Sequence, residues 1–335
     1  MTQLLSLKLR GLKCCLLAQD IAGVFDKAWH PGILAQLRKL KCPPNTYNMV
    51  KDFLRDRTAH VTLGNSLSSK WVTKGCPQGS VSGPTLWNII ISDLIKVLSN
   101  EANVKIVVFA DDIMIMMQGP SLSDILKIMQ TTLQIIDNWC KENRLKISKE
   151  NSARIPMFTR NKEVLKSHPT INERGIKIAS QMKYLGVTLD FKLDWYPHTQ
   201  YLENKVLLIR NSLVRCSTAT WGMTFHNLMT IYKYAILPVI TYASEAWSTS
   251  VSKRAKSKLQ QIQSAFLIFI TKAYKSVSNK ALLAIAGIMA VEQARQLYKD
   301  RRAISRGNPT NAVIAALKKI ETPPKPEGST QKTTT

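Results

Sequence analysis

The stretch VKIVVFADDIMIMM, from Val104 to Met117, places two adjacent carboxylates inside an apolar run. Apart from Lys105, its only polar residues are Asp111 and Asp112. Burying an ionised carboxylate is costly unless its charge is compensated, so the pair needs an explanation. One explanation is the exposed turn of a hairpin, which Asp tolerates well. The other is a metal site, in which the charge of Mg²⁺ offsets that of the carboxylates.

The charge balance of the whole chain is strongly basic. Its 335 residues include 47 Lys and Arg against 22 Asp and Glu, a formal net charge of +25, and 45% of the residues are hydrophobic. This length allows two domains, and the charge points to a polyanionic partner, with nucleic acid first. An anionic membrane surface is the second interpretation, and a generally basic soluble protein is the third.

The cysteines and the apolar segments indicate the cellular compartment in which the protein is expected. The 6 cysteines form no CxxC pair and no Cys/His cluster, which favours free thiols in a reducing compartment and argues against a zinc site. The most apolar candidate for a membrane span, Leu228–Trp247, contains Lys233, Pro238 and Glu245. We therefore expect a buried helix followed by an irregular piece, no membrane association, and an intracellular protein.

Two strand-like stretches can bring three carboxylates together. Cys14–Ile21 is a short apolar run that contains Asp20, and Asp111 ends the first half of the quoted stretch. If both strands lie side by side in one sheet, Asp20 and Asp111 come close, with Asp112 beside them. Three converging carboxylates in a basic protein suit a nucleotidyl transferase that uses two metal ions.

Other segments have clear periodicity. Alternation around a Gly-Asn-Ser turn predicts a hairpin near residues 59–75, and Gln181–Asp190 is typical of a strand. A helix is expected from about Pro84, and a longer amphipathic helix over about Leu122–Asn143. The predicted stripe of the first helix comprises Leu86, Ile90, Leu94 and Val97. From about Trp195 onward, four basic helical segments follow, which indicates a domain boundary near residues 191–196.

Four stretches, in order, resemble successive motifs of reverse transcriptases, in particular those of insect non-LTR (LINE-type) retrotransposons. They are QDIAGVFDKAWH, GCPQGSVSGPTLWNIIISDL, VVFADDIMIM and MKYLGVTLD. In this family an Asp ends a strand with an aromatic five residues later, a P-Q-G turn opens a helix, and an aromatic-x-D-D hairpin follows. The last stretch is similar to the family's primer grip. The resemblance covers roughly residues 13–300.

The resemblance implies roles for individual residues. The expected catalytic and metal-binding residues are Asp20, Asp111 and Asp112, with the backbone carbonyl of Ile21 as a further metal ligand. Phe25 would be the steric gate that excludes a ribose 2′-hydroxyl, and Gln78 and Gly79 would line the nucleotide pocket. Tyr184, Leu185 and Gly186 would form the primer grip. The alternatives are an ordinary core aromatic for Phe25 and a plain helix-entry turn for Gln78 and Gly79.

The implied function is RNA-directed DNA polymerisation, which adds dNTPs to a primer 3′-hydroxyl. The implied cofactor is a pair of Mg²⁺ ions, with Mn²⁺ as the alternative ion. The implied partners are an RNA template and a DNA primer, and the expected location is the nucleus, with a cytoplasmic ribonucleoprotein stage. The oligomeric state stays open.

The expected fold class is α+β. We expect a leader at 1–12, a palm at 13–190 with an antiparallel sheet backed by helices, an all-helical thumb at 191–305, and a disordered tail at 306–335. Candidates for phosphate contacts in the thumb are its basic residues, Lys205, Arg210, Arg215, Lys253, Arg254, Lys256 and Lys258.

Two departures from the family pattern support a second hypothesis. The chain begins almost at the first motif, so the fingers region is expected to be largely missing. Asn151 stands where the family commonly has a lysine, with Lys149 as its candidate substitute. The alternative function is therefore a non-catalytic, nucleic-acid-binding remnant, whereas the three aspartates favour a polymerase.

Overall fold

The computed structural model describes residues 4, 7, 13–76, 79–158, 170–171, 174–216 and 222–305. The chain divides into two compact units, one over residues 2–192 and one from Leu193 onward. The predicted disordered tail at 306–335 lies outside the described residues, as does the predicted leader at 1–12 except for Leu4 and Leu7, which are buried.

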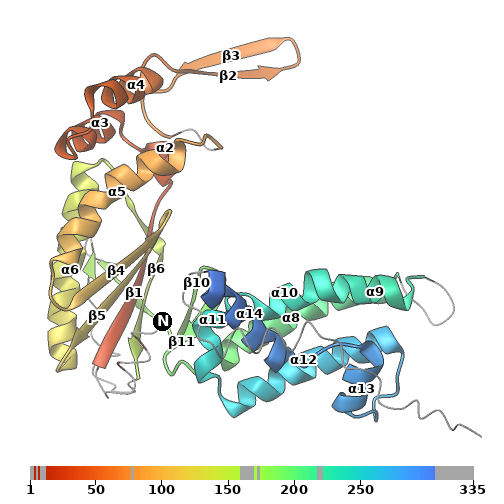
Figure 1. Cartoon of the computed structure of the whole chain (residues 1–335). Helices are drawn as coiled ribbons and strands as arrows, with labels where there is room; N and C mark the ends of the chain where they lie inside the picture. The colour runs from red at the N-terminus through yellow and green to blue at the C-terminus, as the bar shows by residue number, and fades with distance from the viewer. Residues whose placement is uncertain are drawn as a thin grey trace, which may run out of the picture. The chain divides into compact units, whose positions relative to one another are not determined.

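The first unit is built on a five-stranded sheet with the order β4-β5-β1-β6-β9 (Figure 1). Its strands are β1 (Lys13–Ile21), β4 (Val104–Phe109), β5 (Asp112–Gly119), β6 (Ile147–Met157) and β9 (Lys177–Ile178). The neighbours β4–β5, β5–β1 and β1–β6 pair antiparallel, as predicted. Only β9, which pairs parallel with β6 at the edge, departs from that prediction.

Strand β1 occupies the middle of this sheet. Cys15, Leu17 and Ile21 on one face belong to the main hydrophobic core, while Cys14 and Leu16 on the other face are also buried. A strand buried on both faces needs a nearly continuous apolar run. That requirement explains why its sequence does not alternate cleanly.

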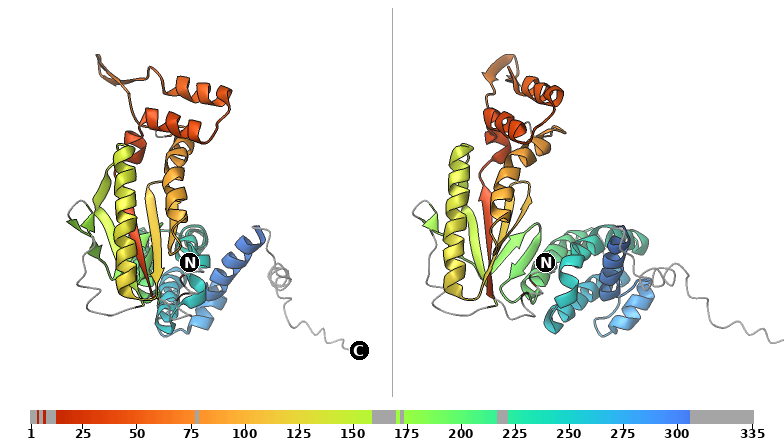
Figure 2. Two further views of the ribbon diagram at one scale, coloured as in Figure 1. Left: turned by 90° about the vertical axis from the view of Figure 1, so that its left-hand side faces the viewer. Right: turned by 60° about the vertical axis from the view of Figure 1, so that its left-hand side comes forward.

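Two long helices, α5 (Gly83–Ser99) and α6 (Leu122–Glu142), cover one face of the sheet (Figure 2). Ser121 caps α6, because its hydroxyl accepts a hydrogen bond from the Asp124 amide. The predicted α5 stripe is wrong at Val97, which is 44% exposed. The helical period carries the stripe to Leu98 instead. The buried residues of α5 are Gly83, Leu86, Trp87, Ile90, Ile91, Leu94 and Leu98.

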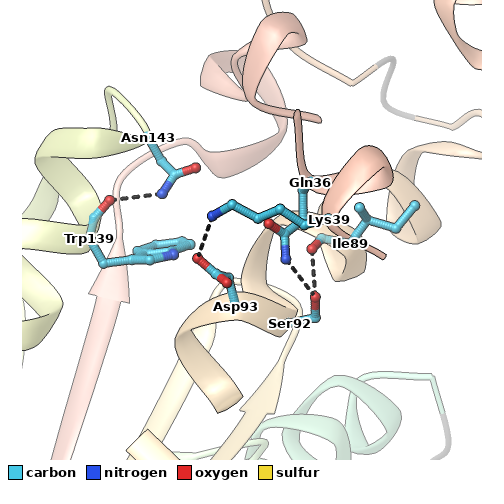
Figure 3. A network of polar contacts seen from close by, with 7 residues as sticks. All are labelled: Gln36, Lys39, Ile89, Ser92, Asp93, Trp139 and Asn143. Carbon is cyan, nitrogen blue, oxygen red and sulfur yellow. Dashed lines mark hydrogen bonds and ion pairs between the residues drawn. The ribbon is translucent and has the colours of Figure 1, made fainter. Parts of the chain in front are cut away.

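Between β1 and α5 the chain forms three helices and a hairpin. They are α2 (Val24–Lys27), α3 (His30–Lys39), α4 (Pro44–Leu54), β2 (Thr58–Leu63) and β3 (Ser66–Trp71). Polar contacts join α3 to α5 (Figure 3): Gln36 donates to the Ser92 hydroxyl at 3.5 Å, and Lys39 pairs with Asp93 at 3.7 Å. The predicted hairpin is confirmed as β2–β3, although every residue in its two strands is exposed.

A second hairpin corrects the expected single strand at Gln181–Asp190. The segment forms β10 (Gln181–Tyr184) and β11 (Val187–Asp190), which pair antiparallel. Leu185 and Gly186 form the turn, with φ of 46° and 78°, and positive φ at both central residues matches the twist of a two-residue hairpin. A two-strand piece, β7 (Thr170–Ile171) with β8 (Arg174–Gly175), completes this unit.

The second unit consists of helices throughout its described part. They are α8 (Tyr196–Val214), α9 (Phe225–Ile231), η1 (Tyr232–Ile236), α10 (Leu237–Thr241), α11 (Ser244–Trp247), η2 (Ser248–Ser250), α12 (Lys253–Thr271), α13 (Asn279–Ala286) and α14 (Val291–Ser305). Tyr232, Trp247 and Phe266 are fully buried in it. This change from a helix-backed sheet to helices confirms the predicted α+β class. No helix in the described part is long and apolar enough to cross a membrane.

Candidate active site

The pairing of β1 with β5 brings two of the predicted carboxylates face to face. Asp20, near the end of β1, lies directly opposite Asp112, the first residue of β5. Side chains directly opposite each other in an antiparallel pair project on the same face of the sheet. Two acidic side chains separated by more than 90 residues in sequence therefore share one corner of the sheet.

Asp111 belongs to the turn that joins β4 to β5. Phe109 and Asp112 form the last pair of that hairpin, so Ala110 and Asp111 are its two turn residues. Ala110 has φ of 52°, a left-handed conformation that is unfavourable for a residue with a Cβ. Asp111 is thus presented at the exposed tip beside the Asp20–Asp112 pair.

A buried tryptophan holds this turn. The indole Nε1 of Trp87, on α5, donates a hydrogen bond of 2.8 Å to the carbonyl oxygen of Ala110. Trp87 is 1% exposed, so its position is fixed by the core. The sequence interpretation missed this role, although a tryptophan on an apolar helix stripe is a signal for it, because a buried indole N–H usually finds an acceptor.

The three carboxylates act on one another electrostatically. Partial burial raises the pKa of Asp112 above its usual range, and the negative charges of Asp111 and Asp20 raise it further. A carboxyl whose pKa is raised by like charges lies in a field that favours a cation. The raised pKa of Asp112 is therefore consistent with the predicted proximity of the three residues.

The donor set suits a hard divalent cation. Mg²⁺ is held by carboxylates, and carbonyl oxygens can complete its ligand shell. Ile21 ends β1 and its side chain is fully buried in the core, so only its backbone carbonyl is available to such an ion. Within the described ranges, however, no three His, Cys, Asp or Glu side chains are arranged so that they could hold a metal ion. The residues therefore offer the oxygen ligands that the cation prefers, and they lie near one another, but the described side chains are not already arranged around a metal position.

Phe25 lies in a cavity of about 550 Å³ between α2 and the base of the β2–β3 hairpin. Its ring is partly exposed and packs against the core. Arg57, Lys74 and Asp26 also line this cavity, so its wall combines one aromatic ring with two cations and one carboxylate. Both the gate and the core interpretations of Phe25 are therefore compatible with its position.

One wall of the cavity is tied to α2 by backbone hydrogen bonds. The Gly75 amide donates to the Ala28 carbonyl at 2.7 Å, and the Cys76 amide donates to the Phe25 carbonyl at 2.5 Å. Gly75 has φ of 97°, and a Cβ there would lie 3.0 Å from two backbone carbonyl oxygens. Glycine is thus required at this close approach.

The remaining predicted pocket residues are only partly described. Gln78 lies outside the described residues. Gly79 is exposed, with φ of 83° and no other atom within 4 Å of where a Cβ would stand, which suits either a pocket lining or a helix-entry turn. The side chains of Lys149 and Asn151 likewise lie outside the described part, so the predicted substitution of one for the other stays a prediction.

The hairpin predicted as the primer grip lies near the carboxylates. Burial raises the pKa of Tyr184, and the charge of Asp112 raises it further. The Tyr184 hydroxyl is buried, with no hydrogen-bond partner among the described residues. Leu185 and Gly186 form the adjoining turn. We call the corner of the sheet with Asp20, Asp111 and Asp112 the acidic corner. The hairpin is therefore close enough to the acidic corner to interact with it electrostatically.

Several of the basic residues predicted to contact phosphate have partners inside the second unit. Lys256 pairs with Glu292, and Lys258 with Glu203, each at 2.8 Å. The guanidinium of Arg254 stacks over Tyr196 at 3.8 Å from the ring centroid. These contacts leave the exposed side chains of Lys253 and Arg215 as freer candidates.

Comparisons with known proteins support the resemblance to reverse transcriptases. A family model described as reverse transcriptase (RNA-dependent DNA polymerase) matches residues 2–189. The chain is 31% identical over 300 residues to the RNA-directed DNA polymerase from mobile element jockey of Drosophila melanogaster, covering 86% of the chain and 30% of that protein. It is 28% identical over 293 residues to the probable RNA-directed DNA polymerase from transposon BS of the same species, covering 84% of the chain and 32% of that protein.

The chain thus spans about a third of the length of these curated relatives. Among solved structures, a telomerase from Candida tropicalis in complex with a fragment of telomeric RNA is 13% identical, with a TM-score of 0.44, covering 96% of this chain and 48% of that one.

Proposed function

The chain belongs to the reverse transcriptase (RNA-dependent DNA polymerase) family, and on that premise we propose that it carries a polymerase active site that copies RNA into DNA. The proposed substrates are dNTPs and a primer annealed to an RNA template. The proposed residues are those of the acidic corner, the Phe25 cavity and the Tyr184 hairpin.

One observation carries the proposal. Asp20 pairs with Asp112 across two strands, and Asp111 occupies the adjoining turn. These aspartates lie in two of the family's motifs, at the same corner of one sheet. A nucleic-acid-binding remnant has no chemical need for three mutually repelling carboxylates.

Members of this family use divalent metal ions, and we propose that two Mg²⁺ ions bind at this corner. Asp20 and Asp111 would hold both ions, the Ile21 carbonyl would add an oxygen ligand, and Asp112 would act as the weaker third acid. When bound, the ions supply activation of the primer 3′-hydroxyl and charge neutralisation of the leaving group.

The other residues position the substrates. The Phe25 ring would occupy the space of a ribose 2′-hydroxyl and so select deoxynucleotides. Gln78 and Gly79 would line the nucleotide pocket. Tyr184, Leu185 and Gly186 would support the primer end, where the buried Tyr184 hydroxyl near Asp112 supports a shared role.

Primer extension on an RNA template tests the proposal directly. Asp111→Asn should lower the extension rate roughly a hundred- to a thousandfold, because a metal contributes several kcal/mol of transition-state stabilisation. Asp52→Asn, an exposed residue of α4, is the matched control and should extend at the parent rate. Extension that survives Asp111→Asn would reject the assignment.

A non-catalytic nucleic-acid-binding remnant is the second candidate. Asn151, which stands where the family commonly has a lysine, favours it. It predicts that the parent chain binds an RNA–DNA hybrid but extends no primer with either Mg²⁺ or Mn²⁺.

A further inference from the structure

A second cavity of about 600 Å³ shares the lining residue Lys74 with the Phe25 cavity and is strongly basic. We call it the cationic cavity, and the residues of its wall that matter here are Lys27, Trp29, Thr73, Lys74, Arg144 and Lys146. Four of these six carry a positive charge, and they come from three separate segments of the chain. Lys74 lines both cavities.

The segments that carry these cations are held together by backbone contacts. Lys74 forms an isolated antiparallel bridge with Trp29. The Lys146 carbonyl accepts a 2.9 Å hydrogen bond from the Ala22 amide, two residues beyond Asp20. The Arg144 guanidinium stacks over the Trp29 ring at 4.3 Å from its centroid, which fixes the cation while leaving its N–H edge available for an anion. These contacts hold the three segments together, and the segment of Lys146 is tied to the chain just beyond Asp20.

Their charges are not paired with a described carboxylate within the cavity itself. No described Asp or Glu lines the cavity, and none of the four cations forms an ion pair with a carboxylate that the structure describes. Converging like charges raise the local potential and attract a multivalent anion. One nucleic-acid strand brings only one charge per nucleotide, whereas pyrophosphate concentrates several charges in a volume that this cavity admits.

We propose that the cationic cavity binds pyrophosphate, the leaving group of nucleotide addition, on its way out of the Phe25 cavity. This inference rests on the proposed function. In that reaction the primer 3′-oxygen bonds to the α-phosphorus and gives its proton to water. The bond from the α-phosphorus to the bridging oxygen breaks, and its electron pair leaves with pyrophosphate. Lys74, which lines both cavities, would pass the anion from one to the other.

Calorimetric titration of the full chain with pyrophosphate tests this inference. The titration is done with chelator and without Mg²⁺, so that a metal at the acidic corner cannot hold the anion. The double variant Lys27→Gln/Lys146→Gln should bind pyrophosphate at least tenfold more weakly, because each charge-assisted contact is strong. The matched control Lys51→Gln/Lys96→Gln removes two exposed helix charges elsewhere and should change the affinity less than twofold. If circular dichroism shows that the double variant is unfolded, the two single variants are titrated in its place and compared with single-variant controls.

Three results would overturn the inference. The first is a parent that shows no pyrophosphate binding at low salt, and the second is a control variant that loses as much affinity for pyrophosphate as the double variant. The third result is a double variant that loses more affinity for single-stranded RNA without terminal phosphates than for pyrophosphate. The titration needs no template, primer or metal. A chain that binds pyrophosphate through this cavity but extends no primer would therefore fail only the proposed function. A chain that extends primers without such binding would fail only this inference.

Discussion

Phe25 has two interpretations that one substitution separates. Its ring lines the cavity between α2 and the β2–β3 hairpin and also touches the core. If it is the steric gate, Phe25→Ala should raise ribonucleotide use relative to deoxynucleotide use by roughly 10- to 200-fold in kcat/KM, the range that loss of a steric contact produces. Single-nucleotide incorporation with both sugars measures the ratio. An unchanged ratio in a folded, active variant would leave Phe25 as a packing residue only.

The raised pKa of Asp112 predicts that the stability of the folded protein depends on pH. Partial burial and the negative charges of Asp111 and Asp20 raise its pKa above the ordinary value of 3.8, so folding favours the protonated form. Its contribution to stability is full below about pH 3.8 and is lost as the pH rises through the higher folded-state pKa. Without metal, Asp112→Asn should therefore raise the urea midpoint at pH 7 and give no gain near pH 3. The same gain in Asp52→Asn would contradict this explanation.

At the scale of elements, α5 determines the shape of the turn that presents Asp111. Trp87→Phe keeps most of the buried volume but leaves the Ala110 carbonyl without its indole donor. We expect the free energy of unfolding to fall by about 1–2 kcal/mol, with a weaker apparent Mg²⁺ affinity in extension assays.

Trp139→Phe is the matched control for this prediction. Trp139 is a buried tryptophan of α6 whose indole N–H has no partner among the described residues. Urea denaturation should show a smaller loss for Trp139→Phe than for Trp87→Phe. Equal losses would attribute the effect to volume rather than to the hydrogen bond.

The net charge of +25 acts at the scale of the whole molecule. Binding that releases counterions weakens linearly with salt on logarithmic axes. We expect the affinity for an RNA–DNA hybrid to fall at least a hundredfold between about 50 and 200 mM salt, as measured by fluorescence anisotropy. Affinity that stays flat over this range would mean that the basic surface is not a nucleic-acid interface.

Local sequence patterns determined the elements and their chemistry. The alternation around Gly64, the apolar run of β1 and the helical stripe of α5 each depend on residues that are close in sequence, so each pattern could be read directly. The order of the motifs predicted Asp20, Asp111 and Asp112 as site residues, and their roles stay a prediction. The same local patterns failed at Leu185 and Gly186, where a strand-like segment contains two left-handed residues and turns back on itself.

Only the tertiary structure decided which distant residues meet. The Asp20–Asp112 register depends on how β1 packs beside β5, and the Trp87 hydrogen bond depends on how α5 packs over that sheet. The cationic cavity gathers cations at 27, 74, 144 and 146, which show no pattern along the chain. Periodicity records which face of an element is buried, whereas these contacts depend on which buried faces pack together, and that choice is made by the whole core.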